Sequence, residues 1–188
     1  TVREQPLTYD DYATLPDDGN RYELVDGVLE LMSPSASAKH QMISFQIQKK
    51  ISDSCENNYF VLYAPLDVIL SPTEVRQPDL VMVHRDRLHI ITKRAIEGPP
   101  DLVVEILSPS SIKRDKISKL NSYAHYQIPE YWIVDPSNGA LEQYVLSENH
   151  YELMNVYIGD EKIHSDHIQC VSFSMNDIMN NIPDLPDN

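Results

Sequence analysis

The sequence lacks the features that would mark a membrane, secreted or multidomain protein. No apolar run in its 188 residues approaches the roughly 20 that a membrane-spanning helix needs, and no signal-peptide pattern opens the chain. Because the sequence starts at Thr1, we expect that the numbered chain lacks its initiator segment. Internal repeats, low-complexity tracts and an interdomain linker are also lacking. These absences favour one domain over residues 1–188, with a core from about residue 7 to 177, a frayed tail at 183–188 and no membrane partner.

Cysteine is scarce. The sequence contains only Cys55 and Cys170, far apart in the chain. Neither belongs to a Cys-x-x-Cys pair or to a Cys/His spacing suited to zinc, which argues against a zinc-binding module. We expect two reduced thiols, as is usual for a cytoplasmic protein.

Positive charge is scarce as well. The chain has 15 Lys and Arg residues against 29 Asp and Glu residues, a net charge of −14. Such a charge argues against non-specific affinity for nucleic acid, whose phosphates are also anionic. Residues 84–119 reverse the balance locally, with eight basic against five acidic side chains. This segment is either a basic contact surface on an acidic protein or only a solvated face.

The periodicity of apolar residues predicts an α/β fold. Helices are expected at residues 7–15, 37–55 and 112–126, with a helical turn at 175–180. Two hairpins are expected, one at residues 21–32 around Asp26-Gly27 and one at residues 141–157. Further strands are expected at residues 59–63, 66–70, 76–83, 101–107, 131–134 and 167–173. The predicted architecture is a mixed sheet of about five or more strands, flanked by helices on both faces, with an N-terminal β-hairpin.

Two of the apolar strand patterns contain a carboxylate. Glu105 lies inside the run from Leu102 to Leu107, and Asp79 stands at the start of another apolar run. An ionised carboxylate in a buried strand is costly unless it is paired or binds a metal. These two residues are therefore the first candidates for a functional site.

The helix expected after the Glu105 strand has two neighbouring stripes. Ile117 and Ala124 belong to an apolar stripe, which we expect to pack on the sheet. Lys116, Lys119 and Tyr123 belong to the adjacent stripe. Because the helix begins just after the strand, a long lysine side chain there can reach the Glu105 carboxylate.

Several motifs resemble a known family. Pro78-Asp79 followed by Glu105-Ile-Leu107 looks like the PD-(D/E)XK nuclease core. A wider set, from about residue 7 to 177, is similar to the bacterial Uma-two family, whose members are catalogued as restriction endonucleases or as a domain of unknown function. That set comprises Arg21-Tyr-Glu-Leu-Val-Asp-Gly27, Pro78-Asp79, Pro100-Asp-Leu-Val-Val-Glu-Ile-Leu-Ser-Pro109, Asp115, Lys119, Tyr123 and Pro129-Glu-Tyr-Trp-Ile-Val-Asp-Pro136.

The resemblance implies a restriction-endonuclease-like core that hydrolyses DNA. Asp79 and Glu105 would hold Mg²⁺, or Mn²⁺, through their oxygens. Lys119 would orient or deprotonate the attacking water, or neutralise charge in the transition state. Glu23 would be the N-terminal acid of the site. Many proteins of this resemblance are dimeric, so a homodimer is expected, with the apolar hairpin at residues 141–157 as a partner surface.

Contacts to phosphate are expected from a second group of residues. His40 lies near the start of the first long helix, and the others belong to the basic segment after the Glu105 strand. This group comprises His40, Lys113, Arg114 and Lys116.

The sequence departs from the nuclease pattern at one position. Nuclease cores place a lysine two residues after the acid, and here that residue is Leu107. Lys119, or failing that Lys116, would have to replace it. The alternative function is therefore an inactive nuclease-fold module that binds a protein partner.

Each site residue also has a structural interpretation. Asp79 is equally compatible with a carboxylate in a strand-end turn, and Glu105 with a structural ion pair to Lys119. Glu23 is compatible with an exposed cross-strand contact in a hairpin. His40 is compatible with an ordinary helix histidine. The sequence leaves these alternatives open.

Overall fold

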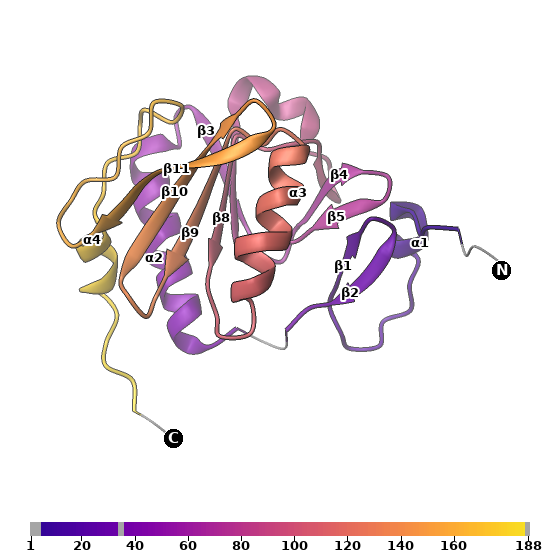
Figure 1. The fold of residues 1–188 in the computed structure, drawn as a ribbon, viewed down its shortest axis with the longest axis horizontal. Helices are drawn as coiled ribbons and strands as arrows, with labels where there is room; N and C mark the ends of the chain where they lie inside the picture. The colour runs from indigo at the N-terminus through magenta and orange to yellow at the C-terminus, as the bar shows by residue number, and fades with distance from the viewer. Residues whose placement is uncertain (1–4, 34–35, 187–188) are drawn as a thin grey trace.

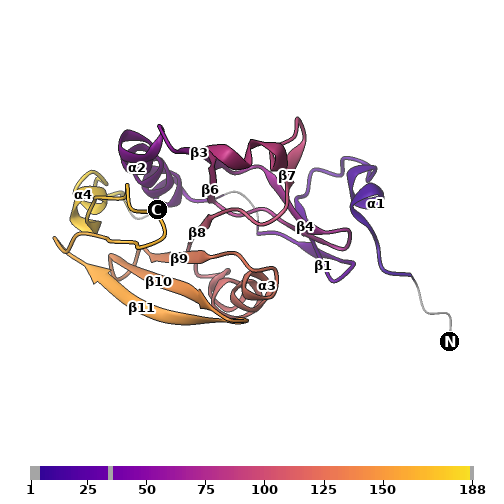
Figure 2. The same ribbon diagram turned by 90° about the horizontal axis from the view of Figure 1, so that it is seen from above.

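The protein forms two β-sheets with helices around the larger one (Figure 1). A computed structural model describes residues 5–33 and 36–186. The larger sheet has the strand order β11-β10-β9-β8-β6-β3, and the smaller has the order β2-β1-β5-β4-β7. The smaller sheet lies toward the N-terminal end of the molecule and β9 to β11 lie toward the other end (Figure 2).

The strands of the larger sheet are β3 (Tyr59–Tyr63), β6 (Leu80–His84), β8 (Leu102–Ile106), β9 (Glu130–Asp135), β10 (Ala140–Ser147) and β11 (His150–Ile158). Those of the smaller sheet are β1 (Tyr22–Val25), β2 (Val28–Leu31), β4 (Asp67–Ser71), β5 (Glu74–Arg76) and β7 (Ala95–Glu97). The pairs β8–β9 and β4–β7 are parallel, and the other pairs are antiparallel. Both sheets are therefore mixed, as the α/β prediction requires.

The helices are α1 (Tyr9–Ala13), α2 (Ala38–Cys55), α3 (Leu120–His125) and α4 (Met175–Met179), with a 3₁₀ segment η1 (Arg85–Ile90) and a π-helical segment η2 (Arg114–Lys119). Thr8, Ser37 and Ser174 cap α1, α2 and α4 by accepting backbone hydrogen bonds with their hydroxyls. Among the described residues, no helix combines the length and apolarity needed to cross a lipid bilayer.

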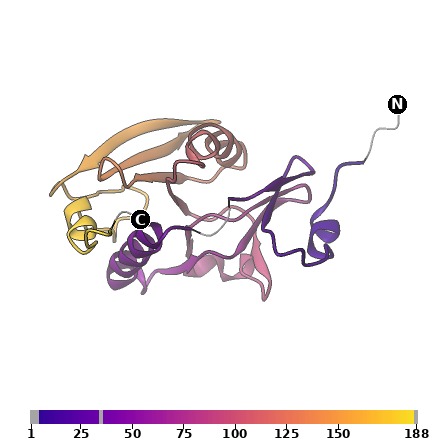
Figure 3. The same cartoon turned by 90° about the horizontal axis from the view of Figure 1, so that it is seen from below.

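Helices α2 and α3 cover opposite faces of the larger sheet (Figure 3). Ile43, Ile47 and Ile51 recur at helical spacing along α2 and pack in one fully buried cluster with Trp132. On the other face, α3 packs Tyr123 into a second cluster with strand residues from β6, β8 and β9. The strands β8 and β9 are consequently buried on both sides, which explains their continuous apolar runs.

The N-terminal hairpin turns at Asp26 and Gly27, as the sequence predicts. Both residues have positive φ, 49° and 77°, which is the left-handed conformation of a tight two-residue hairpin loop. A Cβ atom on Gly27 would lie 2.3 Å from the Cβ of Pro6, so the position accepts only glycine. The hairpin joins the smaller sheet through the pairing of β1 with β5.

The strand expected at residues 76–83 is two strands that belong to different sheets. Strand β5 ends at Arg76 and β6 begins at Leu80. Pro78 lies between them, and proline cannot donate to a strand ladder. The break carries the chain from the smaller sheet to the larger one and leaves Asp79 at the crossing.

Two other sequence-based expectations are wrong. Residues 167–173 form no strand, and Ile168 and Phe173 reach the core from irregular chain instead. Ile117 is 55% exposed rather than packed on the sheet, because the wide π turn of η2 points Lys119 inward in its place. In the hairpin β10–β11, Leu141 and Tyr151 are buried in the protein's own core, whereas Leu153 is exposed, so the expected partner surface is narrowed to β11.

The expected free thiols are also wrong. Cys55 and Cys170 form a disulfide that joins the end of α2 to the segment before α4. They are 115 residues apart, and only the packing of α2 beside the C-terminal segment brings them together. The argument from reduced thiols to a cytoplasmic location therefore no longer holds. Residues 183–186 have no regular secondary structure, and the last two residues of the expected frayed tail lie outside the described part of the chain.

Candidate active site

Asp79 lies where the chain passes between the two sheets. Its Oδ2 accepts a hydrogen bond from the backbone N of Ile106, at 2.8 Å, and lies 3.1 Å from Nε2 of His40 on α2. Burial acts to lower the pKa of His40, but the contact with Asp79 outweighs it and raises that pKa. The raised pKa favours the protonated imidazole, and the contact of Nε2 with Oδ2 helps to fix the orientation of the carboxylate.

Glu105 lies near the end of β8, beside Asp79. Leu80 pairs with Val104 across the antiparallel ladder, so the residue before Leu80 comes alongside Glu105. Glu105 is 3% exposed, and its Oε1 accepts hydrogen bonds from Lys119 Nζ at 2.7 Å and Tyr123 Oη at 2.9 Å. No donor among the described residues reaches its Oε2. Oε2 of Glu105 is therefore available to a ligand.

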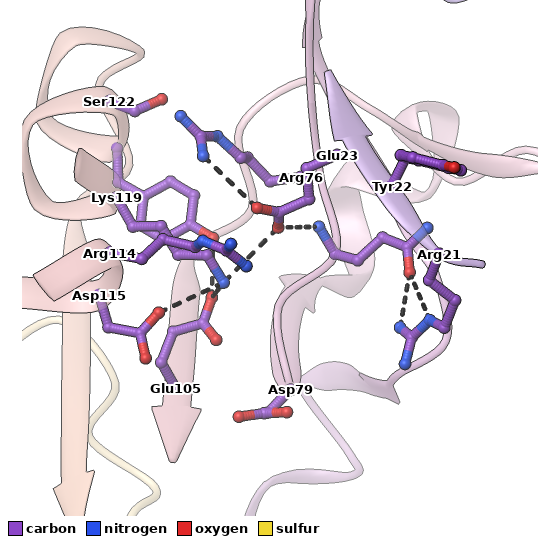
Figure 4. A network of polar contacts seen from close by, with 12 residues as sticks. Arg21, Tyr22, Glu23, Arg76, Asp79, Glu105, Arg114, Asp115, Lys119 and Ser122 are labelled. Atoms are coloured by element: carbon purple, nitrogen blue, oxygen red, sulfur yellow. Dashed lines mark hydrogen bonds and ion pairs between the residues drawn. The ribbon is translucent and has the colours of Figure 1, made fainter. Parts of the chain in front are cut away.

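Lys119 is surrounded by carboxylates (Figure 4). Besides Glu105, its Nζ lies 3.5 Å from Oε1 of Glu23 and 3.5 Å from Oδ1 of Asp115. The side chain is only 5% exposed. Burial acts to lower the pKa of Lys119, but the three carboxylates outweigh burial and raise the pKa above its usual value. The ammonium therefore stays charged.

Glu23 extends from the hairpin strand β1 into this cluster and is fully buried. It also contacts Arg76 Nη1 at 3.5 Å and accepts from the backbone N of Gln77 at 2.9 Å. Burial acts to raise the pKa of Glu23, but Lys119 and Arg76 outweigh it and lower the pKa. The smaller sheet thus contributes an ionised carboxylate to a cluster built mainly on the larger one.

Arg76 extends this cluster away from Lys119. Its Nε donates to Oε1 of Glu74 at 2.7 Å, and Ser122 on α3 donates to the same oxygen. The guanidinium is 1% exposed. Through these contacts β5 holds β1 on one side and the helix that carries Lys119 on the other.

The other carboxylates influence the acidity of Glu105. Burial raises the pKa of the Glu105 carboxyl well above its usual range, although the Lys119 ammonium opposes the shift. The nearby carboxylates of Asp115, Asp79 and Glu23 raise it further. Burial also raises the pKa of Asp115. The crowding of carboxylates around Lys119 thus disfavours the ionised form of Glu105, and a bound cation would oppose this effect.

These groups open to a pocket of about 460 Å³. Asp79, Glu105, Asp115 and Lys119 line one part of it, and the cations of Arg21, Lys39 and Arg114 line it as well. Because both carboxylates and basic side chains line this pocket, it suits a ligand that combines a metal ion with an anion.

The remaining candidates differ in where they lie. Lys116 pairs with Glu142 on β10 at 2.6 Å and does not line the pocket, and Lys113 is exposed outside it. Arg114 lines the pocket and donates to the carbonyl of Leu31 at 3.0 Å. The structure therefore brings Asp79, Glu105, Lys119, Glu23, His40 and Arg114 together and leaves Lys113 and Lys116 outside.

Two residues of the site were not among the sequence-based candidates. Asp115 precedes Lys119 by four residues, a spacing that often marks an ion pair on a helix, and this signal could have identified it. Arg76 could not be recognised, because the pattern of residues 76–83 suggests one strand and hides the crossing between sheets. Leu107, at the position where nuclease cores carry lysine, is buried and lines the pocket.

The donor set suits a hard divalent cation. Within residues 5–33 and 36–186, no group of three or more His, Cys, Asp or Glu side chains forms a complete metal site. Two carboxylates are nevertheless sufficient for Mg²⁺, which usually keeps several of its waters. The open Oε2 of Glu105, the crowding of carboxylates around it and the buried Asp115 Oδ1, which accepts no hydrogen bond, all fit a cation here.

The fold and the site together define the class of protein. It is a two-sheet α/β protein in which carboxylates and a lysine from separate elements converge beside a pocket. The family model of Uma2, described as "Putative restriction endonuclease", matches residues 9–176, and the chain belongs to this family. This confirms the resemblance found in the sequence.

A solved structure supports the same fold. It is the crystal structure of a "putative nuclease belonging to DUF820" from Anabaena variabilis, with a TM-score of 0.76 and 18% sequence identity. The match covers 95% of this chain and 100% of that one. At this identity the similarity concerns the fold alone. No curated protein matches the chain.

Proposed function

We propose that this protein is a metal-dependent endonuclease that hydrolyses phosphodiester bonds in DNA. The observation that carries the proposal is the convergence of Asp79, Glu105 and Lys119, from three separate elements, at one pocket. Membership of a family described as restriction endonucleases supports DNA as the substrate.

Asp79 and Glu105 are the proposed ligands of Mg²⁺ or Mn²⁺. A cation bound there would lower the pKa of a coordinated water and offset the charge that develops on the scissile phosphate. His40 acts as a positioning residue, because its ring nitrogen holds the Asp79 carboxylate. The backbone N of Ile106 holds the same oxygen.

Lys119 is the proposed electrostatic group. Because the surrounding carboxylates raise its pKa, its ammonium keeps its proton and cannot act as a general base. It can stabilise negative charge in the transition state. Glu23 positions this ammonium from the smaller sheet, and Arg114 is placed to contact a phosphate in the pocket.

A second candidate function is an inactive nuclease-fold module that binds a protein partner. Two observations favour it. Lys119 is already surrounded by Glu105, Glu23 and Asp115, and Leu107 occupies the position where nuclease cores carry their lysine. In this case the cluster would serve only to hold the two sheets together.

Calorimetric titration with Mg²⁺ and with Mn²⁺, alongside cleavage of supercoiled plasmid, separates the two functions. The endonuclease binds the metal and cleaves, EDTA stops cleavage, and Glu105→Ala abolishes both. The binding module neither binds the metal at these carboxylates nor cleaves. The Lys116→Met variant is the matched control, because this lysine lies outside the pocket and should leave both signals unchanged.

A homodimer and a cytoplasmic location complete the proposal. Strand β11 is the edge of the larger sheet and exposes Leu153, Met154, Val156 and Ile158, which are suited to pairing with a second copy. Analytical ultracentrifugation of the wild type and of Met154→Asp tests this surface.

The disulfide makes the cellular location testable, since disulfides persist mainly in oxidising compartments. Thiol alkylation in intact cells would find free Cys55 and Cys170 if the protein is cytoplasmic.

A further inference from the structure

A second pocket adjoins the candidate active site. It also measures about 460 Å³, and it shares two lining residues, His40 and Asp79, with the first pocket. From there it follows α2 as far as Ser52 and Asp53. A helix rises about 1.5 Å per residue, so the stretch from His40 to Ser52 is about 18 Å long. The two pockets therefore adjoin at His40 and Asp79, and the second pocket together with this junction is called the groove below.

Two exposed aromatic rings line this second pocket. Phe45 on α2 is 59% exposed, and Tyr63 at the end of β3 is 58% exposed. Neither ring packs against another aromatic ring in the described part of the chain. Tyr63 pairs with Leu80 across the sheet, and the next backbone N, that of Ala64, donates to the carbonyl of Asp79 at 3.0 Å. The backbone next to Tyr63 is thus bonded to that of the proposed metal ligand, and both residues line the second pocket.

The polar side chains between the rings are mostly uncharged. Ser44 and Gln48 continue the helical spacing of His40, and Lys49 lies one turn beyond Phe45. Apart from Asp79 at the junction, Asp53 is the one carboxylate in this lining. Hydroxyl and amide groups can bond to sugars and base edges, and the single lysine can meet a phosphate.

We infer that this groove binds a single strand of nucleic acid whose unpaired bases stack on Phe45 and Tyr63 while its backbone passes Asp79. The inference rests on the proposed function, because it takes the first pocket as the place of cleavage. Stacking needs an accessible base face, which a paired duplex does not offer. The net charge of −14 limits binding through phosphates alone, so contacts to bases gain importance. The preferred substrate is therefore single-stranded, or has a single-stranded portion at the cleaved bond.

The pocket on the opposite side of the site is less suited to a strand. It adjoins the first pocket through Arg21 and Gln77, and its charged lining residues are the three carboxylates Asp17, Asp18 and Asp67 and the two arginines Arg21 and Arg94. Its Tyr12 is held by hydrogen bonds to the protein, one of them from its hydroxyl to Asp67 at 3.2 Å. The two linings have the same surplus of one carboxylate, so it is the exposure of the aromatic rings that favours the groove along α2.

Fluorescence anisotropy with labelled oligothymidylate and oligouridylate, in EDTA so that cleavage does not occur, tests the inference. The wild type should bind a single strand more tightly than a duplex of equal length. Phe45→Ala and Tyr63→Ala should each weaken single-strand binding by about tenfold, and leave duplex binding unchanged. The two oligonucleotides distinguish DNA from RNA as the source of the strand. Leu88→Ala, which removes an equally exposed apolar side chain outside the pockets, should have no effect.

A second variant gives a direct signal of stacking. Phe45→Trp keeps an aromatic face and should restore affinity, and its exposed indole should be quenched by a stacked base. The native Trp132 is fully buried and should not respond. Unchanged single-strand affinity in the Phe45→Ala/Tyr63→Ala double variant, or unquenched Phe45→Trp emission at saturation, overturns the inference.

The outcome is separable from that of the proposed function. Glu105→Gln should abolish cleavage and leave strand binding intact, since Glu105 lies outside the second pocket. If the protein cleaves DNA but binds single strands equally well without the two rings, only the proposal of strand binding in the groove is wrong. If the two rings are needed for binding but no cleavage occurs with metal, only the proposed endonuclease function is wrong.

Discussion

Two buried glutamates on the larger sheet show how differently one fold can use the same side chain. Glu130 lies on the face covered by α2, where its strand neighbour Trp132 packs, and Glu105 lies on the face covered by α3. Glu130 is 1% exposed and Glu105 is 3% exposed. Their surroundings differ in the number and kind of hydrogen-bond donors.

Every oxygen of Glu130 has a partner. Oε1 accepts from Trp132 Nε1 and Gln143 Nε2, at 2.6 and 2.7 Å, and Oε2 accepts from Ser165 Oγ at 2.6 Å. Glu105 has donors on Oε1 only, and one of them is the charged Lys119. A buried carboxylate that is completely satisfied is part of the structure, whereas one that keeps a free oxygen beside a pocket is available for a ligand.

The largest effect that this comparison predicts is on catalysis. Glu105→Gln keeps the shape of the side chain and the acceptor for Lys119 and Tyr123, but removes the charge that would hold a cation. Plasmid cleavage should fall about a thousandfold, because both metal binding and transition-state stabilisation depend on that charge. Urea unfolding should show a stability change below about 1 kcal/mol. A variant that still cleaves at half the wild-type rate would show that the open oxygen has no catalytic role.

The next effect is on folding. Lys119→Met removes the ammonium from among Glu105, Glu23 and Asp115, leaving buried carboxylates without their cation. The free energy of unfolding at pH 7 should fall by about 3–5 kcal/mol in urea titrations. Lys116→Met is the matched control: its half-exposed pair with Glu142 should contribute less than about 1 kcal/mol. An equal loss of unfolding free energy in both variants would mean that the ion pairs of Lys119 stabilise the fold no more than the ion pair of Lys116 with Glu142 does.

Sequence reasoning identified the residues whose signal is local. Glu105 interrupts an apolar run, and Asp79 follows a proline at the edge of another, so each is visible within a few residues. The helical wheel left both Lys116 and Lys119 within reach of Glu105, and the family resemblance then favoured Lys119. The helical wheel did place Lys119 and Tyr123 on one stripe, and both are buried beside Glu105.

Features that depend on distant parts of the chain could not be predicted. The inward direction of the Lys119 stripe results from the π turn of η2, which a regular 100° wheel does not describe. Arg76 joins the site only because β5 and β1 pair in a second sheet, and Glu23 on β1 could be assigned to the site only through the family resemblance. The disulfide needs contact across 115 residues, and the sequence alone gives no partner for either cysteine.

A smaller effect should appear at the satisfied glutamate. Glu130→Gln turns one acceptor oxygen into a donor, so at least one of the three donors around it loses its partner. The free energy of unfolding should fall by about 2 kcal/mol, and cleavage should be unchanged. The measurement is again a urea titration, with Glu105→Gln as the matched substitution. The comparison fails if Glu130→Gln lowers cleavage as strongly as Glu105→Gln does.

The smallest effect concerns pH. Because burial raises the pKa of Glu105 in the folded protein, protonated Glu105 stabilises the fold fully below its unfolded pKa of about 4.3. This stability is lost as the pH rises through the raised folded-state pKa, by at most about 1.4 kcal/mol per pH unit for one proton. Thermal melts in EDTA should therefore show the midpoint falling with rising pH, and Mg²⁺ should reduce the fall because it binds the ionised form. Glu105→Gln should lose this slope and Glu130→Gln should keep it. If the melting midpoint depends on pH in the same way in the wild type and in both variants, another group titrates. The pKa of Glu105 would then not be raised in the folded protein.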